Sequence, residues 1–499
     1  MKNKKLFSIT LLGLFMLAIV GLLQADDGQM FRRNVSKTPD QETERANLNH
    51  MSFYVPAQTS DGLITGVEYY DASGALVETR DYAKPLVAVY IDSLESTVEE
   101  YILSEADLNP DAPLAVLSGT TFGAHDAYAA LSLDDGATWK RTNLSNSADL
   151  SSFNLANGHA YPGDAHNMTF GIAGDKVLVG WISKYCDGGS PAYTWTDEEG
   201  NDVYPDIWGV AGSQRSVNYT LQGFPEVGEI PYSCVWSARG TLLEVDADGV
   251  PTVGGGFYDI VWTKAERLTS GRRDANRLEI NGDGAAGFMM IWQEDPEGLR
   301  PGQGLGPGEG WSGAVVNQQT DLWYSYISTN DFIQVQTSDE DETAVSIYDY
   351  TGDTMPKVAV PMALPVRLTD NKMCKASGSD PYCYIDFDNV DTEGNLILSD
   401  PLPTTPEPGA DFCATTVAWT NPGGTTLDLC QAEDGRVLQG RVGASRPRVN
   451  VQPYDSDGDG VYDSAWVITA AEESKALGEG DEELEPEDIG KNMWYYTFD

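Results

Sequence analysis

The chain has 499 residues and carries 77 Asp and Glu against 31 Lys and Arg, a formal net charge of −46 at pH 7. A surface this negative repels nucleic acid and anionic membranes, so we exclude both as partners. It favours divalent cations and also suits a high-salt habitat. The length allows one large all-β domain or two domains of ordinary size.

The N-terminus has the composition of a secretory signal peptide. Three lysines among the first five residues precede a nearly uninterrupted apolar run, residues 6–23, and the small residue Ala25 offers a cleavage position. An uncleaved membrane anchor is the alternative, because the apolar run is close to spanning length. The acidic sequence after Ala25 favours cleavage, and no cysteine stands there for lipid attachment. We therefore expect residues 1–25 to be removed and the protein to be exported to the periplasm, the cell surface or the medium.

The rest of the chain predicts a flexible lead-in and one β-rich domain. Residues 26–50 are polar and lack periodicity, which is typical of a flexible segment. Clusters of Gly, Asp, Asn and Pro then separate short apolar and aromatic runs at residues 114–117, 127–133, 176–182, 257–262, 287–292, 322–327, 358–364 and 465–470. This pattern predicts an all-β sandwich, barrel or propeller. Because residues 51–499 show no break in composition, we expect a single β-propeller domain of about six or seven blades.

One hairpin turn has a recognisable motif. Residues 132–139 read Ser-Leu-Asp-Asp-Gly-Ala-Thr-Trp, in which Asp135-Gly136 is a turn dipeptide and Trp139 begins the returning strand. The motif resembles the Asp box (also called the BNR repeat) on hairpins of sialidase-like β-propellers. A single ordinary hairpin is the alternative. The motif is architectural, so it predicts a fold and not an activity.

The cysteines predict disulfides. An even number in an exported chain favours pairing, although six cysteines allow fifteen connectivities. The six are Cys186, Cys234, Cys374, Cys383, Cys413 and Cys430. Pairing Cys374 with Cys383 and Cys413 with Cys430 would close two short loops and leave Cys186 with Cys234. None has zinc-finger spacing, so a cysteine-based zinc site is not expected.

Four longer phrases are similar to one family. They are residues 184–189, 228–236, 268–277 and 292–300. Together they resemble the bacterial exported proteins called choice-of-anchor O, over most of the chain from about residue 110. The resemblance implies an exported, often surface-attached protein without an established activity. The sequence lacks the C-terminal apolar anchor of such proteins, so we expect either free secretion or a piece of a longer chain.

One acidic segment has the spacing of a calcium loop. Carboxylates alternate along the chain, a glycine permits a sharp turn, and a later carboxylate closes the loop, as hard oxygen ligands for Ca²⁺ require. The expected ligands are Asp455, Asp457, Asp459, Val461 (through its carbonyl) and Asp463. The alternative is an acidic turn without an ion. We expect Ca²⁺ to have a structural role here, because it offsets the repulsion between the carboxylates.

The histidines offer a weaker metal site. His125, His159 and His166 lie close together in the sequence, and with Asp126 or Asp164 they have the donor atoms that copper or zinc prefers. We favour the alternative in which these histidines form local hydrogen bonds.

A glycosidase site would need two carboxylates on either side of a sugar ring. Glu294 and Glu297 follow an apolar strand, and arginines that would bind a substrate carboxylate bidentately stand at positions 272, 273, 277, 446 and 448. Glu294, Glu297, Arg272 and Arg273 are therefore candidate catalytic residues. An Arg-Ile-Pro motif and a Tyr-Glu nucleophile pair, which sialidases carry, are missing. A solvated acidic turn is the alternative.

These observations favour an exported, surface-associated β-propeller that binds a ligand and is stabilised by calcium and disulfides. We expect its partner to be a glycan or a cell-surface protein, and we expect binding rather than catalysis. A sialidase-like glycoside hydrolase and a propeller enzyme with a histidine-ligated metal are the alternatives.

Overall fold

The structure is a computed structural model. It describes residues 34–38, 43–71, 73–93, 101–102, 121–122, 125–154, 160–187, 195–196, 202–203, 214–218, 229–295, 320–338, 341, 343–369, 415–420, 426–431, 437–438, 442–462, 464–475 and 491–499. The predicted signal peptide lies outside these residues. The first strand lies inside the segment predicted as a flexible lead-in, because its backbone pairs with a buried strand of the domain.

Four antiparallel sheets form the body of the protein, and each is a meander that follows the chain. Sheet 1 has the order β1 (Thr43–His50), β8 (Leu86–Asp92), β11 (Asp126–Ser132) and β12 (Lys140–Asn143). Sheet 2 has the order β13 (Ala165–Ala173), β14 (Lys176–Ser183), β19 (Cys234–Val245) and β20 (Phe257–Trp262), with β21 (Glu266–Arg267) also paired to β19. Sheet 3 has the order β22 (Asp274–Asp283), β23 (Gly287–Asp295), β24 (Asp321–Ile327) and β27 (Val366–Arg367). Sheet 4 has the order β31 (Val442–Tyr454), β32 (Ser464–Lys475) and β33 (Lys491–Phe498).

Small sheets and single helical turns connect these strands. The pairs are β2 (Val55–Pro56) with β7 (Tyr82–Ala83), β3 (Gln58–Thr59) with β4 (Gly62–Leu63), β5 (Val67–Tyr70) with β6 (Leu76–Arg80), β9 (Tyr101–Ile102) with β10 (Thr121–Phe122), β15 (Trp195–Thr196) with β16 (Asp202–Val203), β17 (Ser216–Asn218) with β18 (Glu229–Pro231), and β25 (Gln334–Gln336) with β26 (Ala344–Ser346). β28 (Thr415–Thr420), β29 (Thr426–Gln431) and β30 (Val437–Leu438) form a three-stranded sheet. The described helices are α2 (Thr329–Phe332) and a 3₁₀ turn at Ile347–Asp349. In this part of the chain, helical segments are far too short to span a bilayer.

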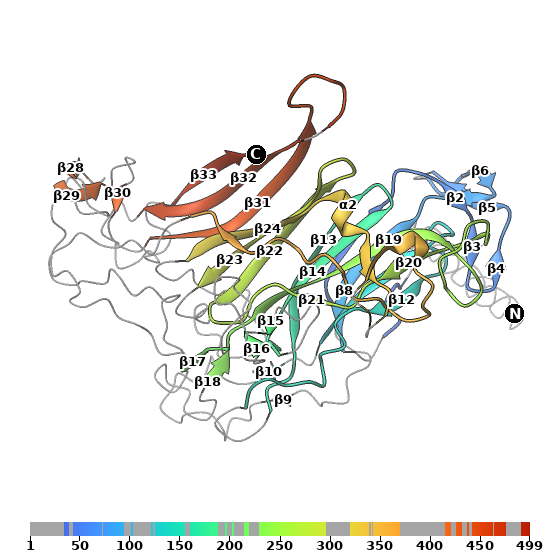
Figure 1. Cartoon of the computed structure of the whole chain (residues 1–499), viewed down its shortest axis with the longest axis horizontal. Helices are drawn as coiled ribbons and strands as arrows, with labels where there is room; N and C mark the ends of the chain where they lie inside the picture. Colours follow the sequence, from blue (N-terminus) through green and yellow to red (C-terminus); the bar gives the residue numbers. More distant parts are fainter. Residues whose placement is uncertain are drawn as a thin grey trace, which may run out of the picture.

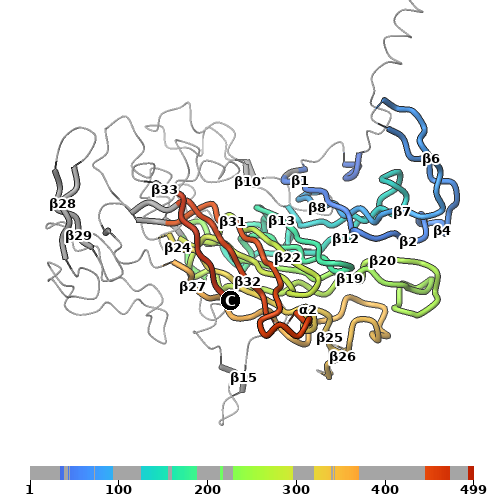
Figure 2. Tube along the Cα trace, turned by 90° about the horizontal axis from the view of Figure 1, so that it is seen from above, coloured from blue at the N-terminus to red at the C-terminus, as the bar shows by residue number. Residues whose placement is uncertain are grey.

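The four sheets stack in chain order, with their first strands as neighbours: β13 contacts both β1 and β22, and β22 contacts β31 (Figure 1). Figure 2 shows the same succession from above. The all-β prediction is confirmed. Within the described residues the sheets remain separate and form no closed ring, so a count of six or seven blades stays a prediction.

Strand β14 shows why its sequence is almost continuously apolar. Val177, Val179 and Trp181 pack in the core shared with sheet 1, whereas Leu178 and Ile182 pack in the core shared with sheet 3. A strand buried on both faces has no polar side to present to water. Five of the predicted apolar runs are inner strands of their sheets: residues 127–133, 176–182, 287–292, 322–327 and 465–470. The run at 257–262 is the edge strand β20, residues 358–364 form only an isolated bridge at Val358, and residues 114–117 lie outside the described residues.

Strand β23 occupies the same position in sheet 3. Met290 and Trp292 face sheet 2, while Met289 and Ile291 face sheet 4. The sheets approach closely at Gly180, where an added Cβ would lie 2.7 Å from Leu278 Cδ2 and from Met290 Cε. The absence of a side chain there lets sheets 2 and 3 pack together.

The predicted turn at residues 132–139 joins β11 to β12 and is closed by its own side chains. Asp134 Oδ1 accepts hydrogen bonds from Ser132 Oγ and Thr138 N, both at 2.8 Å, and Asp134 Oδ2 accepts one from Thr138 Oγ1 at 2.6 Å. Gly136, at φ 81°, donates its N–H to Ser132 Oγ at 2.9 Å. The Trp139 indole N–H donates to the Gly136 carbonyl at 3.0 Å, which fixes the ring against the turn.

One predicted disulfide is present. Cys186 and Cys234 are bonded, and both side chains are buried between the end of β14 and the start of β19. Cys374, Cys383 and Cys413 lie outside the described residues, as does the side chain of Cys430, so the other two pairs stay predictions. A disulfide is compatible with export into an oxidising compartment.

The two ends of the sheets differ. At one end, β8, β14, β23 and β32 each lead through a long connection to the next strand of the same sheet. We call this the long-loop end. At the opposite end, a tight turn joins β13 to β14, another joins β22 to β23, and the Asp-box turn joins β11 to β12. Binding residues concentrate on long loops held by a rigid scaffold, so the long-loop end is the expected position of a binding site.

Candidate functional site

The first strand of each of the four main sheets carries a β-bulge near the long-loop end. The pairing register breaks between Glu44 and Asn47 in β1 and between His166 and Thr169 in β13. The same break occurs between Asn276 and Glu279 in β22 and between Ser445 and Arg448 in β31. A bulge bends a strand and redirects a side chain, and bulges are common beside functional sites. Four equivalent bulges therefore mark one region of the stack.

Each bulge holds a non-glycine residue in the left-handed conformation. These residues are Arg45 (φ 52°), Asn167 (φ 49°), Arg277 (φ 53°) and Arg446 (φ 52°). The conformation costs an L-residue about 1–2 kcal/mol, and asparagine tolerates it better than arginine does. Strain repeated at equivalent positions indicates a functional constraint on these side chains.

The bulge residues bring arginines from three sheets together. Burial lowers the pKa of Arg277, and the positive charges of Arg446 and Arg45 lower it further. Arg448 acts in the same direction, whereas Glu472 opposes it. Like charges that act on one half-buried guanidinium favour a bound anion. We call Arg45, Arg277, Arg446 and Arg448 the arginine cluster.

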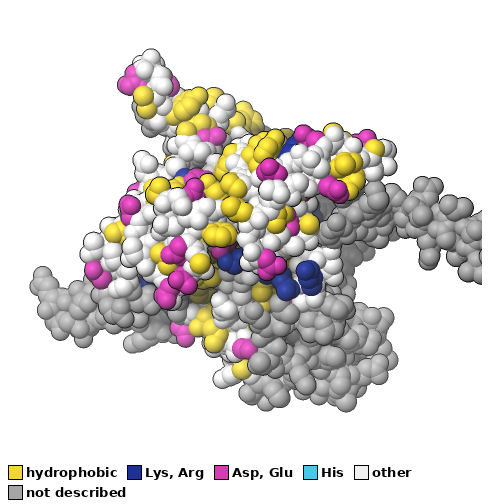
Figure 3. Space-filling view, turned by 90° about the vertical axis from the view of Figure 1, so that its right-hand side faces the viewer, with side chains coloured by type: hydrophobic (Ala, Val, Ile, Leu, Met, Phe, Trp, Pro, Cys, Tyr) yellow, Lys and Arg dark blue, Asp and Glu magenta, His cyan; other side chains and the backbone are white. Residues whose placement is uncertain are grey.

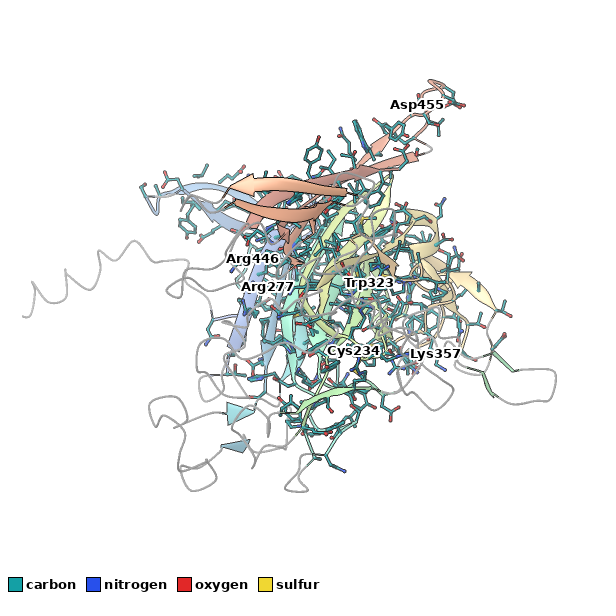
Figure 4. All side chains as sticks on the ribbon, turned by 90° about the vertical axis from the view of Figure 1, so that its left-hand side faces the viewer. Cys234, Arg277, Trp323, Lys357, Arg446 and Asp455 are labelled. Carbon is teal, nitrogen blue, oxygen red and sulfur yellow. A yellow bond between two sulfur atoms is a disulfide. The ribbon has the colours of Figure 1, made fainter. Side chains whose placement is uncertain are left out.

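Two members of the arginine cluster are partly neutralised. Arg446 Nη1 lies 2.7 Å from Glu472 Oε2 on the neighbouring strand, and Arg448 forms an ion pair with Glu279 across the junction of sheets 3 and 4. Arg277 forms no ion pair with any residue that the structure describes. Figure 4 shows Arg277 and Arg446 next to each other on adjoining sheets. Arg277 is therefore the half-buried cation that an incoming anion would neutralise.

Asparagines support the centre of this region. Asn167 Nδ2 donates a hydrogen bond to Asn276 Oδ1, which joins the bulges of β13 and β22. Asn276 Oδ1 also accepts from the N–H of Arg277 at 2.8 Å. These bonds hold the backbone that positions Arg277, so its orientation is set before any ligand arrives.

The candidate catalytic residues on β23 and before β22 lie in a buried polar layer. Glu294 Oε1 accepts from Trp292 Nε1 at 2.8 Å, and Glu294 Oε2 lies 3.3 Å from Arg273 Nε. Arg273 also lies 3.8 Å from Asp321 Oδ2, and its guanidinium stacks over the Trp323 ring. Glu294 and Arg273 are thus paired with each other in the interior of the protein. For either to act in catalysis, a substrate would have to reach this buried layer. Their catalytic role stays a prediction.

Arg272 and Glu297 are the two remaining candidates for the hydrolase alternative. Arg272 is half-buried, and its backbone N–H donates to Ser270 Oγ at 3.3 Å. Glu297 lies outside the described residues.

Two of the three candidate histidines flank one carboxylate. His125 Nδ1 lies 2.8 Å from Asp164 Oδ1. Burial acts to raise the pKa of Asp164, but the hydrogen bond and charge of His125, with the charge of His166, hold it below its usual value. Burial lowers the pKa of His166 to about 4, against the attraction of Asp164. His159 lies outside the described residues, so copper or zinc binding stays a prediction.

The acidic loop between β31 and β32 is compact and exposed. One carboxylate oxygen from each of Asp455, Asp457 and Asp459 lies within 4.8 Å of the other two, the one group of this kind among the described residues. Asp455 accepts backbone N–H bonds, the strongest from Gly460 at 2.6 Å, and these lower its pKa. Val461 donates its N–H to Asp459 Oδ1 at 2.8 Å.

This loop lies far from the arginine cluster. Figure 4 places Asp455 at the tip of a long hairpin, away from Arg277 and Arg446. Asp463, the last predicted calcium ligand, lies outside the described residues.

Sequence reasoning listed Arg277, Arg446 and Arg448 only as arginines available to a hydrolase, and it did not include Arg45. Nothing local marks these positions, because an arginine in the left-handed region has no sequence signature. The one usable signal is an arginine shortly after the first strand of sheets 1, 3 and 4 begins, which requires the strand order to be known.

Comparison with known proteins gives little further information. No family model and no curated protein matches the chain, so the relation to the choice-of-anchor O family stays a prediction. Trypanosoma rangeli sialidase in complex with sialic acid aligns over 88% of this chain and 57% of that chain, with 11% identity and a TM-score of 0.21. The same enzyme with the inhibitor DANA aligns over 88% and 58%, with 12% identity and a TM-score of 0.20. This chain thus spans less than two thirds of those proteins, and likenesses this weak establish neither fold nor function.

Proposed function

We propose that this protein is an exported, surface-associated β-propeller whose arginine cluster binds the anionic group of a ligand, in the first instance an acidic glycan. Successive antiparallel meanders with neighbouring first strands, three of them with four strands in order and one with three, are the arrangement of propeller blades, which supports the architecture. The observation that carries the function is the left-handed arginine at equivalent bulges of three sheets.

The chemistry of the arginine cluster favours a carboxylate, sulfate or phosphate. A guanidinium presents a planar fork of N–H donors that matches two oxygens of such a group. The half-buried position of Arg277 strengthens the attraction, because water screens it less. The rest of the surface is strongly negative, so anions would gather only where cations are concentrated.

Anion binding should depend on Arg277. We expect Arg277→Asn to weaken binding about 10- to 100-fold, because a charge-assisted hydrogen bond is lost at a partly buried site. Asparagine is chosen because it tolerates the left-handed conformation and stands at the same place in β13. Isothermal titration with N-acetylneuraminate, glucuronate, inorganic sulfate and inorganic phosphate measures the effect and identifies the preferred anion.

The control for this experiment is Arg141→Asn, which removes an exposed arginine from the outermost strand of sheet 1. It should leave anion affinity unchanged. Equal affinity in Arg277→Asn and the parent protein, or no binding of any of the four anions, would refute the proposed site.

A hydrolysis assay beside these titrations separates binding from hydrolysis. Glu279 and Glu472 are carboxylates in contact with the arginine cluster, and each pairs with an arginine. Release of 4-methylumbelliferone from its sialoside or glucuronide, lost in Glu279→Gln or Glu472→Gln, would support the hydrolase alternative instead. Binding without turnover supports the proposed function.

We also propose that the loop at Asp455, Asp457 and Asp459 binds Ca²⁺ and stabilises the hairpin of β31 and β32. Three carboxylate oxygens in mutual reach support this, since a divalent cation relieves their repulsion. We expect EDTA to lower the melting temperature and added Ca²⁺ to restore it, since a ligand at a hundredfold excess over its dissociation constant stabilises by about 2.7 kcal/mol. Differential scanning calorimetry measures the shift.

The matched control for calcium is the double variant Asp457→Ala and Asp459→Ala. It should melt at the temperature of the EDTA-treated protein and ignore both additions. If EDTA still lowers the melting temperature of this variant, the ion binds elsewhere. If EDTA does not change the melting temperature of the parent protein, the calcium proposal is wrong.

A further inference from the structure

A cavity of about 500 Å³ opens at the end of sheets 1 and 2 opposite the long loops. Three separate parts of the chain line it: the hairpin of β3 and β4, the Asp-box turn between β11 and β12, and the hairpin of β19 and β20. We call this the hairpin pocket. Its volume lies in the range of small-molecule sites.

The hairpin pocket has an aromatic wall. Trp139, Phe257 and Tyr258 line it, above apolar side chains such as Leu133 and Val245. The Trp139 indole N–H already donates to the Gly136 carbonyl. A ligand would therefore interact with the π-face of the ring and not with its N–H. Phe257 is 36% exposed, so part of its ring is accessible to a ligand.

Carboxylates dominate the polar lining of the hairpin pocket. Asp61, Asp246, Asp248 and Asp259 stand against a single ammonium, Lys140. Lys140 is already paired with Asp259. Ionised carboxylates only accept hydrogen bonds, so the complementary ligand is rich in donors.

The shape of the hairpin pocket is fixed by one glutamine. Gln58 Nε2 donates to the Tyr258 carbonyl at 2.7 Å, and Gln58 Oε1 accepts from the Tyr258 N–H at 2.8 Å. The Gln58 N–H donates to the Leu133 carbonyl at 3.0 Å. The β3–β4 hairpin is thus tied to sheets 1 and 2 at once, and the pocket exists before a ligand binds.

We propose that the hairpin pocket binds a small organic cation that carries an ammonium or guanidinium group on an apolar body. Such a group donates hydrogen bonds to the carboxylates, needs no donor in return, and is attracted to the faces of Trp139 and Phe257. An anion is repelled by the same lining. Figure 3 shows one side of the molecule, on which acidic and hydrophobic side chains are interspersed with a few basic ones.

The hairpin pocket and the arginine cluster lie at opposite ends of the sheets and have opposite charge. The pocket is therefore a second, independent site, and its failure would not affect the proposed anion site. The cation binds either as a free amine or as the side chain of a lysine or arginine in a peptide. Both present the same chemistry to the pocket.

The test uses cadaverine and agmatine as free cations, a blocked lysine peptide as the second source, and pentane-1,5-diol as the neutral control of similar shape. We expect titration calorimetry on the full chain to detect the cations at concentrations of about 1 mM or below, and to detect no diol binding. Affinity should fall with ionic strength, because part of the attraction is between exposed charges. Preference for the peptide or the free amines identifies the source.

Two variants test the residues. Trp139→Ala should weaken cation binding about tenfold, and Asp248→Asn should weaken it several-fold while leaving the Asp-box turn intact. Trp466→Ala and Asp353→Asn remove an exposed tryptophan and an exposed aspartate outside the hairpin pocket and should change nothing. Equal binding of diol and cadaverine, binding of neutral sugars in place of cations, or no loss in Asp248→Asn would overturn the proposal.

Discussion

Arg239→Met should lower the free energy of unfolding by about 3–5 kcal/mol, because it leaves a buried carboxylate without its counter-ion. Arg239 and Glu266 are each about 1% exposed, and Arg239 Nη2 lies 3.2 and 3.1 Å from the two carboxylate oxygens. Glu266 Oε2 also accepts from the Met362 N–H at 3.2 Å, so the pair joins sheet 2 to the chain that follows β26. Urea denaturation followed by circular dichroism measures the loss.

The double variant Arg239→Met and Glu266→Leu is the control. It removes both charges, so it should recover most of the stability that the single variant loses. If the double variant is as unstable as the sum of the two single variants, the two residues do not interact energetically and the explanation is wrong.

The sign of the pH dependence follows from Glu266. Burial raises its pKa and Arg239 opposes that rise. A carboxyl whose pKa is raised on folding contributes stability at low pH that is lost as the pH rises through the folded-state pKa. Without Arg239 the pKa rises further, so the deficit of Arg239→Met should be larger at about pH 8 than at about pH 5.

Loss of the disulfide between Cys186 and Cys234 should have an effect of similar size. The bond closes a loop between residues 48 apart, and constraining a loop of that length in the unfolded chain stabilises the folded state by about 4 kcal/mol. Gly271 packs directly on the bond: a Cβ there would lie 2.8 Å from Cys186 Sγ. The bond therefore also supports the segment that leads into β22 and Arg277.

The experiment is the double variant Cys186→Ala and Cys234→Ala, with urea denaturation in the presence and absence of dithiothreitol. The parent protein should lose stability on reduction. The variant lacks this bond, so reduction at this position cannot lower its stability. A loss below about 1 kcal/mol would show that the unfolded chain is not constrained by this bond. Weaker anion binding by the variant would show that the disulfide also holds the arginine cluster in place.

Much of the local structure follows from the sequence alone. The apolar runs at 176–182 and 287–292 become β14 and β23, because side chains that must avoid water on both faces fit only the middle of a stack. Asp135-Gly136 forms the expected turn, since glycine and aspartate reach the left-handed region at low cost. The pairing of Cys186 with Cys234 agrees with one of the fifteen connectivities, the one suggested by closing two short loops with the other four cysteines.

The candidate sites depend on contacts that the sequence does not encode locally. Arg277 and Arg446 come together because β22 and β31 are neighbours in the stack, and Arg45 acts on Arg277 from β1, on the other side of sheet 2. The bulges that direct these arginines arise from pairing register between strands. Glu294 appears in the sequence as an exposed acid after a strand, yet the structure buries it against Trp292. The hairpin pocket joins three segments far apart along the chain.

The sequence by itself determined the all-β class, most strands of the stack and the turn at residues 132–139, and it suggested one disulfide. These depend on hydrophobic periodicity, turn chemistry and cysteine spacing, which act over a few residues or are visible by counting. The tertiary structure alone decided which charges are buried, which arginines meet and where cavities form. Those properties are set by long-range register and sheet packing, whose energies depend on residues that are remote in the sequence.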